Sequence, residues 1–433
     1  RPAAHLHPVK LADPPLHGSA TRDLMRFYFP DSQDLISPSY DFMRDEYHPL
    51  RIRQRDDRYA HEVLTPAPYD GVLVSKAVVD GTASGAGKYS EPQRQRLYRY
   101  GVHEFFRLPD SMRSMGDCGA FNYVAEPEPP YSVKDVADFY EHCGFDEGVS
   151  VDHVILGYAP QADASSVNPE WRVRQRITLE LAATFLDEVN SRGTPFEPLG
   201  AAQGWSPESY AASVTRLQEI GYKRIAMGGM VPLKTRDILD VLRAVSSILN
   251  PDTQLHLLGV TRVDTMHEFA RLGATSFDST TAMRQAFMDD RHNYHTAGSA
   301  YTAVRIPQVD GNPRLKRAIL SGDVPQQEAL KLERSALKAV REYGAHRVGL
   351  KDTLEAVVAY EQLVTGGKKN YVAMYRDTLS DRPWEACDCT ICDDLGIEVV
   401  VFRGTERNKR RGFHNLHVLN QKVRGLALAT SGS

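Results

Sequence analysis

The stretch EPLGAAQGWSPESYAASVTRLQEIGYKRIAMGG, residues 197–229, contains one complete unit of the expected fold. A short apolar run ends at a Gln-Gly turn, an amphipathic helical stretch follows, and a second apolar run ends at two glycines. Apolar runs of strand length that alternate with helical stretches are typical of parallel βα units. Residues 197–229 therefore predict a strand, a helix and a second strand that lies parallel to the first.

The same alternation extends on both sides of this unit. The later units begin about 25 to 30 residues apart, which is the spacing of βα units in a parallel sheet. This repeat favours an α/β fold of the (β/α)8 type, a TIM barrel. A doubly wound sheet is the alternative, although no GxGxxG motif follows a first strand. The apolar runs are GVLVSKAVV (71–79), VDHVILGY (151–158), EPLGAAQG (197–204), RIAMGG (224–229), QLHLLGV (254–260) and ATSFDST (274–280).

Three segments complete the expected domain organisation. Residues 1–68, rich in Pro, Asp, Arg and aromatic side chains, are expected to form an N-terminal cap. The barrel domain is expected to span 69–383, with an insertion of polar helices near 285–350. Residues 384–433 contain a cysteine cluster and a basic stretch, and are expected to form a separate zinc-binding subdomain.

The composition is that of a soluble globular protein, with 42% hydrophobic and 25% charged residues. No apolar run is long enough to span a membrane, and the opening RPAAHLHPVK lacks the apolar core of a signal peptide. We therefore expect a cytoplasmic protein without a membrane partner. The net charge of −4 excludes a polycation, so a nucleic acid would have to bind a local basic patch.

Three of the five cysteines lie close together near the C-terminus, in the motif CDCTIC. Thiolates at this spacing, with a downstream histidine, suit tetrahedral Zn²⁺ in a Cys₃His site. Both His414 and His417 follow the motif, and we favour His414 because of its HNL context. Four such ligands leave no open position. The expected cofactor is therefore a structural Zn²⁺ bound by Cys387, Cys389, Cys392 and His414.

Several predicted strands end in polar residues, and in an α/β barrel the chemistry is located at these ends. Asp117 ends SMGD, Asp152 lies in SVDHVI and Asp278 lies in SFDST. Carboxylates can attack a glycosidic carbon or transfer protons, but a single Asp at such a place can equally cap a helix. Gln203 and the pair Gly228–Gly229 end neighbouring strands, where side chain and bare backbone could contact a flat heterocycle.

Taken in order, these motifs resemble the tRNA-guanine transglycosylase superfamily. GDCGAF is similar to its Asp-Ser-Gly-Gly-Phe motif, GAAQG to its Val-Gln-Gly strand and AMGGM to its Gly-Gly-Leu strand. LHLLGVTRVDTMHEFARLGATSFDST resembles the stretch that ends in the nucleophile motif, and CDCTIC followed by HNL resembles the zinc subdomain. Two departures are Gly119-Ala120-Phe121 in place of Gly-Gly-Phe, and STTAMRQAF, which lacks the usual Pro-Thr-Arg.

The resemblance implies an enzyme that exchanges a base in a polynucleotide through a covalent glycosyl-enzyme. Asp278 would be the nucleophile that attacks C1′, and Asp117 would act as the acid and then as the base. The residues that would bind the base are Asp152, Gln203, Gly228, Gly229 and Met230.

Four segments resemble the DNA-acting branch of the superfamily, called DpdA, which inserts 7-cyano-7-deazaguanine (preQ0) into DNA. They are RFYFPDSQDLISPSYDF, RQRDDRYAHEVL, PYDGVLVSKAVV and the GDCGAF form. The resemblance implies DNA and the preQ0 base as partners, and leaves open whether other proteins of a DNA-modification system take part. Two alternatives also stay open: a tRNA-directed enzyme of the same superfamily, and a non-catalytic nucleic-acid-binding subunit.

The segment after the glycine pair favours the neutral nitrile base. It reads Met230-Val231-Pro232-Leu233-Lys234, and no acid occurs before Asp237. Related enzymes that accept an aminomethyl base have a Glu here, and such a carboxylate would match the cation.

A basic run near the C-terminus is expected to contact phosphates, because Lys and Arg outnumber acids there. A solvated helix face is the alternative, and the sequence favours phosphate contact only slightly. The run comprises Arg403, Arg407, Lys409, Arg410 and Arg411, followed by Lys422 and Arg424.

Overall fold

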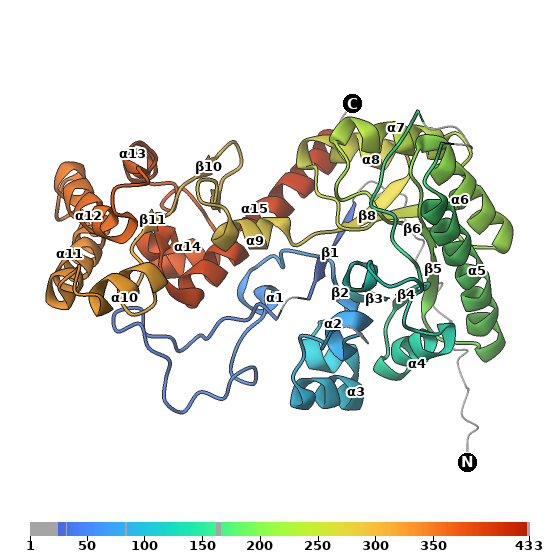
Figure 1. The fold of residues 1–433 in the computed structure, drawn as a ribbon, viewed down its shortest axis with the longest axis horizontal. Coiled ribbons are helices and arrows are strands. Elements are labelled where there is room, and N and C mark those ends of the chain that lie inside the picture. The colour runs from blue at the N-terminus through green and yellow to red at the C-terminus, as the bar shows by residue number, and fades with distance from the viewer. Residues whose placement is uncertain (1–24, 32, 83–84, 162–165, 431–433) are drawn as a thin grey trace, which may run out of the picture.

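The computed structural model describes residues 25–31, 33–82, 85–161 and 166–430, and Figure 1 shows their arrangement. Eight parallel strands form a closed barrel, because the first strand pairs with both the second and the eighth. This confirms the predicted fold class. The strands are β1 (Arg26–Pro30), β2 (Gly71–Ser75), β3 (Arg113–Asp117), β4 (Glu147–Val149), β5 (Glu197–Ala202), β6 (Arg224–Met227), β7 (Gln254–Leu257) and β8 (Ala274–Asp278).

Side chains that alternate along the strands fill the barrel interior. Tyr28 of β1 points inward and donates a hydrogen bond to Glu147 at 3.0 Å, and Arg224 pairs with the same carboxylate at 2.7 Å. These buried groups lie near the start of the strands, which leaves the carboxyl ends for the site. The inward-facing apolar layer is Tyr28, Leu73, Met115, Val149, Leu199, Ala201 and Ala226.

Helices follow most strands and cover the outside of the barrel (Figure 1). Capping fixes their ends, as in the unit that predicted the fold: Ser206 accepts from the Ser209 N–H at 3.2 Å, and Gly221, at φ 118°, ends the helix. The helices are α1 (Ala60–Val63), α2 (Lys76–Asp80), α3 (Glu91–Phe106), α4 (Val133–Cys143), α5 (Pro169–Arg192), α6 (Pro207–Ile220), α7 (Thr235–Ser246), α8 (Met266–Arg271) and α9 (Thr281–Met288), with 3₁₀ turns η2 (Ala120–Tyr123) and η3 (Val263–Thr265).

The first barrel strand comes from the segment that the sequence analysis assigned to an N-terminal cap. The run RFYFP was not recognised as a strand because it is short, but its alternation fits one: Tyr28 points into the barrel, while the Phe27 ring stacks outside on Phe277 at 5.0 Å. A closed eight-stranded barrel needs this strand between β2 and β8. Residues 1–24 of the expected cap lie outside the described residues.

A second difference concerns the apolar run 151–158, which was expected to be a strand. The strand β4 lies just before it, and 151–158 continues from β4 as an extended loop at the carboxyl end of the barrel. Its backbone therefore bonds with side chains, as when Ile155 N–H donates to Gln203 Oε1 at 3.1 Å.

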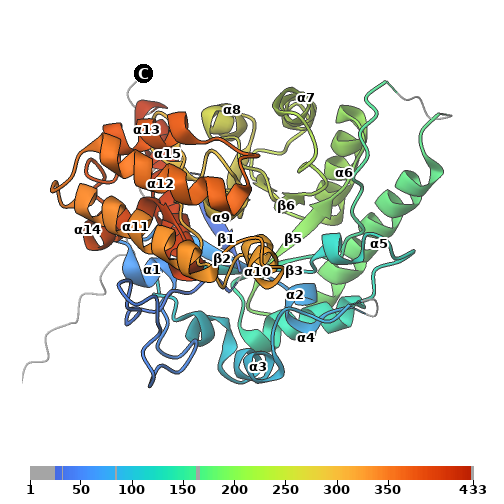
Figure 2. The same ribbon diagram turned by 60° about the vertical axis from the view of Figure 1, so that its left-hand side comes forward.

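The C-terminal part forms a helical unit beside the barrel (Figures 1 and 2). The expected insertion near 285–350 extends further, to Asp381, and the parallel pair of β11 and β12 joins it to the cysteine-containing segment. Helix α15 packs against α8 and α9 and so connects the unit to the barrel. The elements are β9 (Tyr294–His295), β10 (Ala300–Tyr301), β11 (Val304–Arg305), α10 (Pro313–Leu320), α11 (Gln326–Gly344), α12 (Leu350–Thr365), α13 (Val372–Asp381), α14 (Thr390–Leu395), η4 (Gly396–Val400), β12 (Val401–Phe402) and α15 (Gly404–Thr430).

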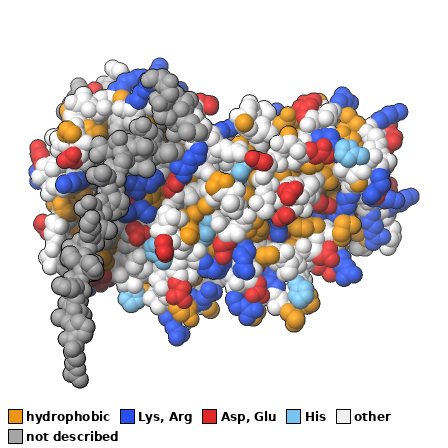
Figure 3. All heavy atoms as spheres, turned by 180° about the vertical axis from the view of Figure 1, so that it is seen from behind, with side chains coloured by type: hydrophobic (Ala, Val, Ile, Leu, Met, Phe, Trp, Pro, Cys, Tyr) orange, Lys and Arg blue, Asp and Glu red, His pale blue; other side chains and the backbone are white. Residues whose placement is uncertain are grey.

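The surface carries mixed charge. On the face shown in Figure 3, Lys and Arg side chains are interspersed with Asp and Glu, in agreement with the small net charge of −4. Among the described residues, no helix is both long and apolar enough to cross a bilayer.

Candidate active site

A cavity of about 760 Å³ opens at the carboxyl ends of the barrel strands. The loops and strand ends that surround it come from widely separated parts of the sequence, as the barrel topology requires. Six of the seven residues predicted for catalysis or base binding line this cavity. They are Asp117, Asp152, Gln203, Gly228, Gly229 and Asp278.

Met230 does not line the cavity. Its side chain is fully buried in the core, so the prediction that it contacts the base is wrong for the side chain. The next residue, Val231, lines the cavity instead and is 43% exposed. The chain turns at Gly229, where φ is 71°, and this turn directs Met230 inward.

Asp278 is held at the end of β8 by two hydrogen bonds to one oxygen. Its Oδ1 lies 3.1 Å from Nε2 of His256 and accepts the Gly259 N–H at 3.0 Å. The other ring nitrogen of His256 lies 2.8 Å from the Ser276 hydroxyl, which fixes the orientation of the ring. Both bonds involve Oδ1 and orient the carboxylate, and no hydrogen bond to Oδ2 comes from the residues that the structure describes.

Asp117 ends β3 in a site that favours its protonated form. Burial raises the pKa of its carboxyl to about 7, against the effect of a hydrogen bond with Ser75, and the charges of Asp278 and Asp152 raise it further. Its Oδ1 is buried and has no hydrogen-bond partner among the described residues. A carboxyl group with a pKa near neutrality can both give and take a proton at physiological pH.

Asp152 and Gln203 form a polar wall. Gln203 Nε2 donates to Asp152 Oδ2 at 2.7 Å, and Tyr123 donates to the Asp152 carbonyl at 3.0 Å. Burial raises the pKa of Asp152 to about 6, against the effect of the Gln203 hydrogen bond. A buried carboxylate and amide held together in this way can match the donor and acceptor edge of a heterocycle.

The glycine pair lets the backbone approach this wall closely. A Cβ at Gly228 would lie 2.2 Å from Gln203 Nε2, and one at Gly229 would lie 2.3 Å from the Ile155 carbonyl oxygen. Gly229, at φ 71°, therefore requires glycine, and a side chain at Gly228 would displace the Gln203 amide from its place beside Asp152. The Gly228 carbonyl is in turn fixed by Tyr210, whose hydroxyl donates to it at 2.8 Å.

Sequence reasoning did not assign four residues that the structure brings to this site. Ser75 and Phe121 line the cavity, and Phe121 is 50% exposed. His256 and Gly259 hold Asp278. A polar histidine inside the apolar run QLHLLGV was the available signal for His256, and the motif GDCGAF already contained Phe121.

The predicted metal ligands form a cluster away from this cavity. Nδ1 of His414 lies 3.5, 3.5 and 3.3 Å from the sulfur atoms of Cys387, Cys389 and Cys392, and all four ligand atoms lie within 4.8 Å of one another. Zn–S bonds of about 2.3 Å and Zn–N bonds of about 2.0–2.1 Å in a tetrahedron separate S from N by about 3.6 Å. The four residues therefore fit a metal site such as one for Zn²⁺.

Neighbouring groups orient the histidine ligand. His414 Nε2 lies 2.7 Å from the His295 carbonyl, which leaves Nδ1 free to bind a metal, and the Tyr294 ring stacks on the imidazole at 4.0 Å. Asn415 accepts the His295 N–H at 2.9 Å. His417 instead lies 3.3 Å from Asp388 Oδ1. The geometry therefore supports His414 over His417 as the fourth ligand.

We predict that His414→Ala reduces bound zinc from one ion per chain to none, because the three thiolates alone leave the metal shell incomplete. The C-terminal unit should then lose stability, since the metal contributes to its folding free energy. Elemental analysis and thermal unfolding measure both effects. His417→Ala is the matched control and should keep its zinc; zinc loss only in that control would contradict the assignment.

The prediction that the basic run at the start of α15 and just before it contacts phosphates is wrong for four of its members. Arg403, Arg407, Arg410 and Arg411 are buried, with at most 6% exposure. Arg407 pairs with Glu398 at 2.6 Å and with Asp45 at 2.5 Å. These buried guanidinium groups bond with acids and carbonyl groups of the protein itself, and they cannot reach a phosphate in this conformation.

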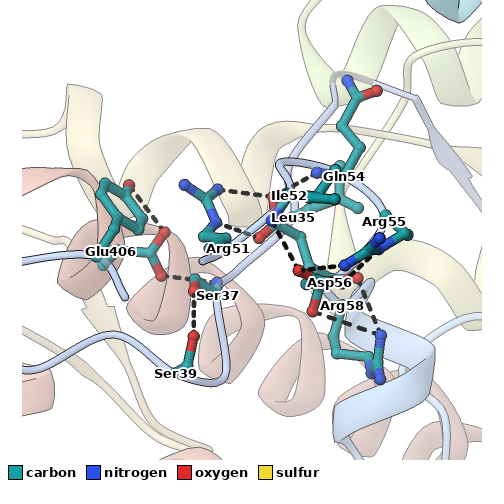
Figure 4. Close-up of polar contacts among 12 residues, drawn as sticks. Leu35, Ser37, Ser39, Arg51, Ile52, Gln54, Arg55, Asp56, Arg58 and Glu406 are labelled. Atoms are coloured by element: carbon teal, nitrogen blue, oxygen red, sulfur yellow. Dashed lines mark hydrogen bonds and ion pairs between the residues drawn. The ribbon is translucent and has the colours of Figure 1, made fainter. Parts of the chain in front are cut away.

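Residues 33–59, which come after β1, supply several of the groups that contact these basic side chains. Glu406 of α15 accepts the Ser37 N–H at 3.0 Å (Figure 4), and Arg410 donates to the Ser37 carbonyl at 2.7 Å. Lys409 is half-buried and donates to the Leu35 carbonyl at 3.1 Å. Arg424 pairs with Asp70. The charge pattern of α15 thus serves to attach this segment and the barrel to the C-terminal unit.

Comparison with known proteins supports the interpretation of the cavity. No protein-family model matches the sequence. The chain is 52% identical over 404 residues to a DNA-guanine transglycosylase of Salmonella montevideo, an alignment that covers 92% of this chain and 96% of that protein. The chain therefore belongs to the family of this transglycosylase, the DNA-acting branch of the tRNA-guanine transglycosylase superfamily, and is a guanine transglycosylase enzyme.

Proposed function

We propose that this enzyme replaces guanine in DNA with preQ0 through a covalent intermediate on Asp278. The observation that carries the proposal is the pair of unlike carboxyl groups in one cavity: Asp278 is fixed by His256 and Gly259, while Asp117 has a pKa of about 7. Two carboxyl groups whose environments differ in this way suit a nucleophile and an acid–base partner.

In the first step, an oxygen of the Asp278 carboxylate attacks C1′ of the target deoxyguanosine. The bond from C1′ to N9 breaks, and guanine takes the proton of Asp117 and leaves as the neutral base. In the second step, ionised Asp117 takes a proton from the incoming base, whose N9 attacks C1′ and displaces Asp278. Two inversions at C1′ retain the configuration.

The base that reacts has to leave the helical stack before it can reach the cavity. We propose that Asp152 accepts hydrogen bonds from the N–H groups on its pyrimidine edge, while Gln203 and the backbone at Gly228 and Gly229 complete the contact. The exposed Phe121 at the cavity offers an apolar surface to the flat ring. Guanine and preQ0 have the same pyrimidine edge, so the same protein groups can bind both bases and one site can serve both steps.

The decisive test is whether the deazaguanine is found in DNA or in tRNA. DNA is proposed because the relative at 52% identity is named a DNA-guanine transglycosylase. Nucleoside mass spectrometry of DNA and tRNA from cells with and without this protein should detect the deazaguanine in DNA. Deazaguanine in tRNA, with none in DNA, would assign the protein to the tRNA-directed enzymes instead.

We predict that preQ0 is exchanged at least about tenfold faster than its 7-aminomethyl analogue, because an ammonium group without a counter-charge would lose its hydration in the site. Val231, which follows the glycine pair and lines the cavity, offers no carboxylate. Parallel exchange assays with both bases measure the ratio. Equal rates, or a preference for the amine, would mean that another group supplies the negative charge.

We predict that guanine release in the first step slows as the pH rises above about 7, the pKa of Asp117. Only protonated Asp117 can supply the proton, so the active fraction falls about tenfold per pH unit above its pKa. Single-turnover release of labelled guanine between pH 6 and 9 measures this. A rate that stays constant to pH 9 would remove Asp117 from the role of acid.

A further inference from the structure

A second cavity, of about 500 Å³, lies in the C-terminal unit. It is formed where β11, the start of α10, the end of α12 and β12 meet. Its lining contains four cationic side chains and one acidic one: Arg305, Arg314, Lys368 and Lys369 against Glu361. None of the residues considered so far for catalysis or for metal binding takes part in it.

The charge of this cavity is not balanced by acids. Asp290 pairs with two of the cations, Arg305 at 2.5 Å and Lys369 at 2.7 Å. Arg314 and Lys368 have no carboxylate partner in the part of the chain that the structure describes. Burial raises the pKa of Glu361, against the effect of a hydrogen bond that it accepts from Tyr375 at 2.8 Å, and even in its charged form Glu361 with Asp290 would leave the four cations in excess. The cavity therefore has a surplus of positive charge.

Two of the four cations, Arg305 and Arg314, are held in place by contacts within the protein. The Arg305 guanidinium lies 4.2 Å from the centre of the Phe402 ring. Arg314 donates to the Val364 carbonyl at 3.0 Å, and a Cβ on Gly366 would lie 1.9 Å from its Nη2, so only glycine lets the guanidinium rest there.

Two further polar atoms on the wall favour an anion. Nε of Arg305 and Oγ1 of Thr365 are buried and have no hydrogen-bond partner among the described residues. Arg305 and Thr365 both line the cavity, so a small turn of either side chain would present its donor to a phosphate oxygen.

This cavity lies next to the active-site cavity. Asp289 lines the active-site cavity, and the next residue, Asp290, bonds with Arg305, Lys369 and Tyr371, which all line the second one. Consecutive Cα atoms are about 3.8 Å apart, so the backbone at Asp289 and Asp290 connects the linings of the two cavities.

We propose that this second cavity binds a backbone phosphate of the DNA strand that carries the target guanosine. That the bound polymer is the DNA substrate rests on the proposed function. That the ligand group is a phosphate rests on the surplus of cations and on the buried donors. Phosphate contacts of this kind position a strand without regard to its sequence. The cavity thus takes the role that the sequence analysis had given to the arginines of α15.

The competing explanation is that Arg314 only caps the C-terminal end of α12, where cations are favourable. Lys368 separates the two explanations, because its side chain is exposed and makes no hydrogen bond or ion pair within the described residues. Its replacement should not affect the helix.

The test measures DNA affinity of Arg314→Ala/Lys368→Ala and of Lys368→Glu by fluorescence anisotropy over a range of salt concentrations. The double variant should bind a labelled oligonucleotide about tenfold more weakly near 0.1 M salt, and its slope of log K against log salt should be smaller in magnitude by roughly 0.7 to 0.9, the contribution of one phosphate. In exchange assays the KM for DNA should rise, with kcat little changed. Arg334→Ala/Lys351→Ala, which removes two exposed cations of the same unit, is the matched control and should bind like the wild type.

Unchanged affinity and slope in both cavity variants, with normal thermal stability, would overturn the proposal. Displacement of DNA from this cavity by dGMP or inorganic phosphate at micromolar concentration would identify a free-anion site and overturn it as well. The proposed function fails separately, if the wild-type protein exchanges bases in tRNA and not in DNA.

Discussion

Asp278→Asn should reduce base exchange by about 10⁴-fold or more, the scale of loss seen when a covalent nucleophile is removed. The amide keeps the size of the side chain, and its oxygen can still accept from His256 and Gly259. It lacks the negative charge that attacks C1′. Incubation with DNA should give a covalent adduct on a denaturing gel for the wild type and none for the variant.

The fold should be unaffected by this change, which thermal unfolding and zinc content would verify. Asp237→Asn, on α7 and outside the cavity, is the matched control and should exchange bases at the wild-type rate. Turnover retained in Asp278→Asn, or an adduct that still forms, would require a different nucleophile and would contradict the proposed chemistry.

Arg407→Ala should lower the free energy of unfolding by about 3–5 kcal/mol, the usual cost of breaking a buried ion pair by removing one partner. The side chain is 1% exposed, and its loss takes from Asp45 and Glu398 the buried cation that they share, which leaves Asp45 with Arg403 alone and Glu398 with Arg341 alone. It also removes a hydrogen bond to the Phe42 carbonyl at 2.9 Å. Denaturant unfolding followed by tryptophan fluorescence measures the loss.

This result distinguishes the two interpretations of the basic run. If Arg407 contacted phosphates, the variant would keep its stability and bind DNA more weakly. Lys422→Ala, on the same helix but half-buried, is the control and should change stability by less than about 1 kcal/mol. Equal stability of Arg407→Ala and the wild type would contradict the buried ion-pair assignment.

The raised pKa of Asp117 shows why a site can be found from sequence before its chemistry can be assigned. The motif GDCGAF identified the residue, but its pKa of about 7 results from burial and from the charges of Asp278 and Asp152. Asp278 ends β8 and Asp152 lies in the loop after β4, so the shift depends on how the barrel closes and is not a property of the local sequence.

The sequence by itself determined the parts of this protein that depend on local spacing. Alternating apolar and helical stretches gave the barrel, since each βα unit is specified by neighbouring residues. The same holds for the metal cluster, because CDCTIC brings three ligands together in one turn. The strand-end residues Asp117, Gln203 and Asp278 were found because parallel strands bring their carboxyl ends together in any barrel.

Only the tertiary structure decided which polar groups lie inside. The run from Arg403 to Arg411 has the same composition whether it faces solvent or acids, and the acids Asp45 and Glu333 come from segments far away in sequence. The sequence did not predict β1 because its pairing partners are also far away in the chain. The short aromatic run becomes a strand when β2 and β8 supply its hydrogen-bond partners. Burial and pairing across the chain are fixed by long-range contacts, and no local pattern encodes them.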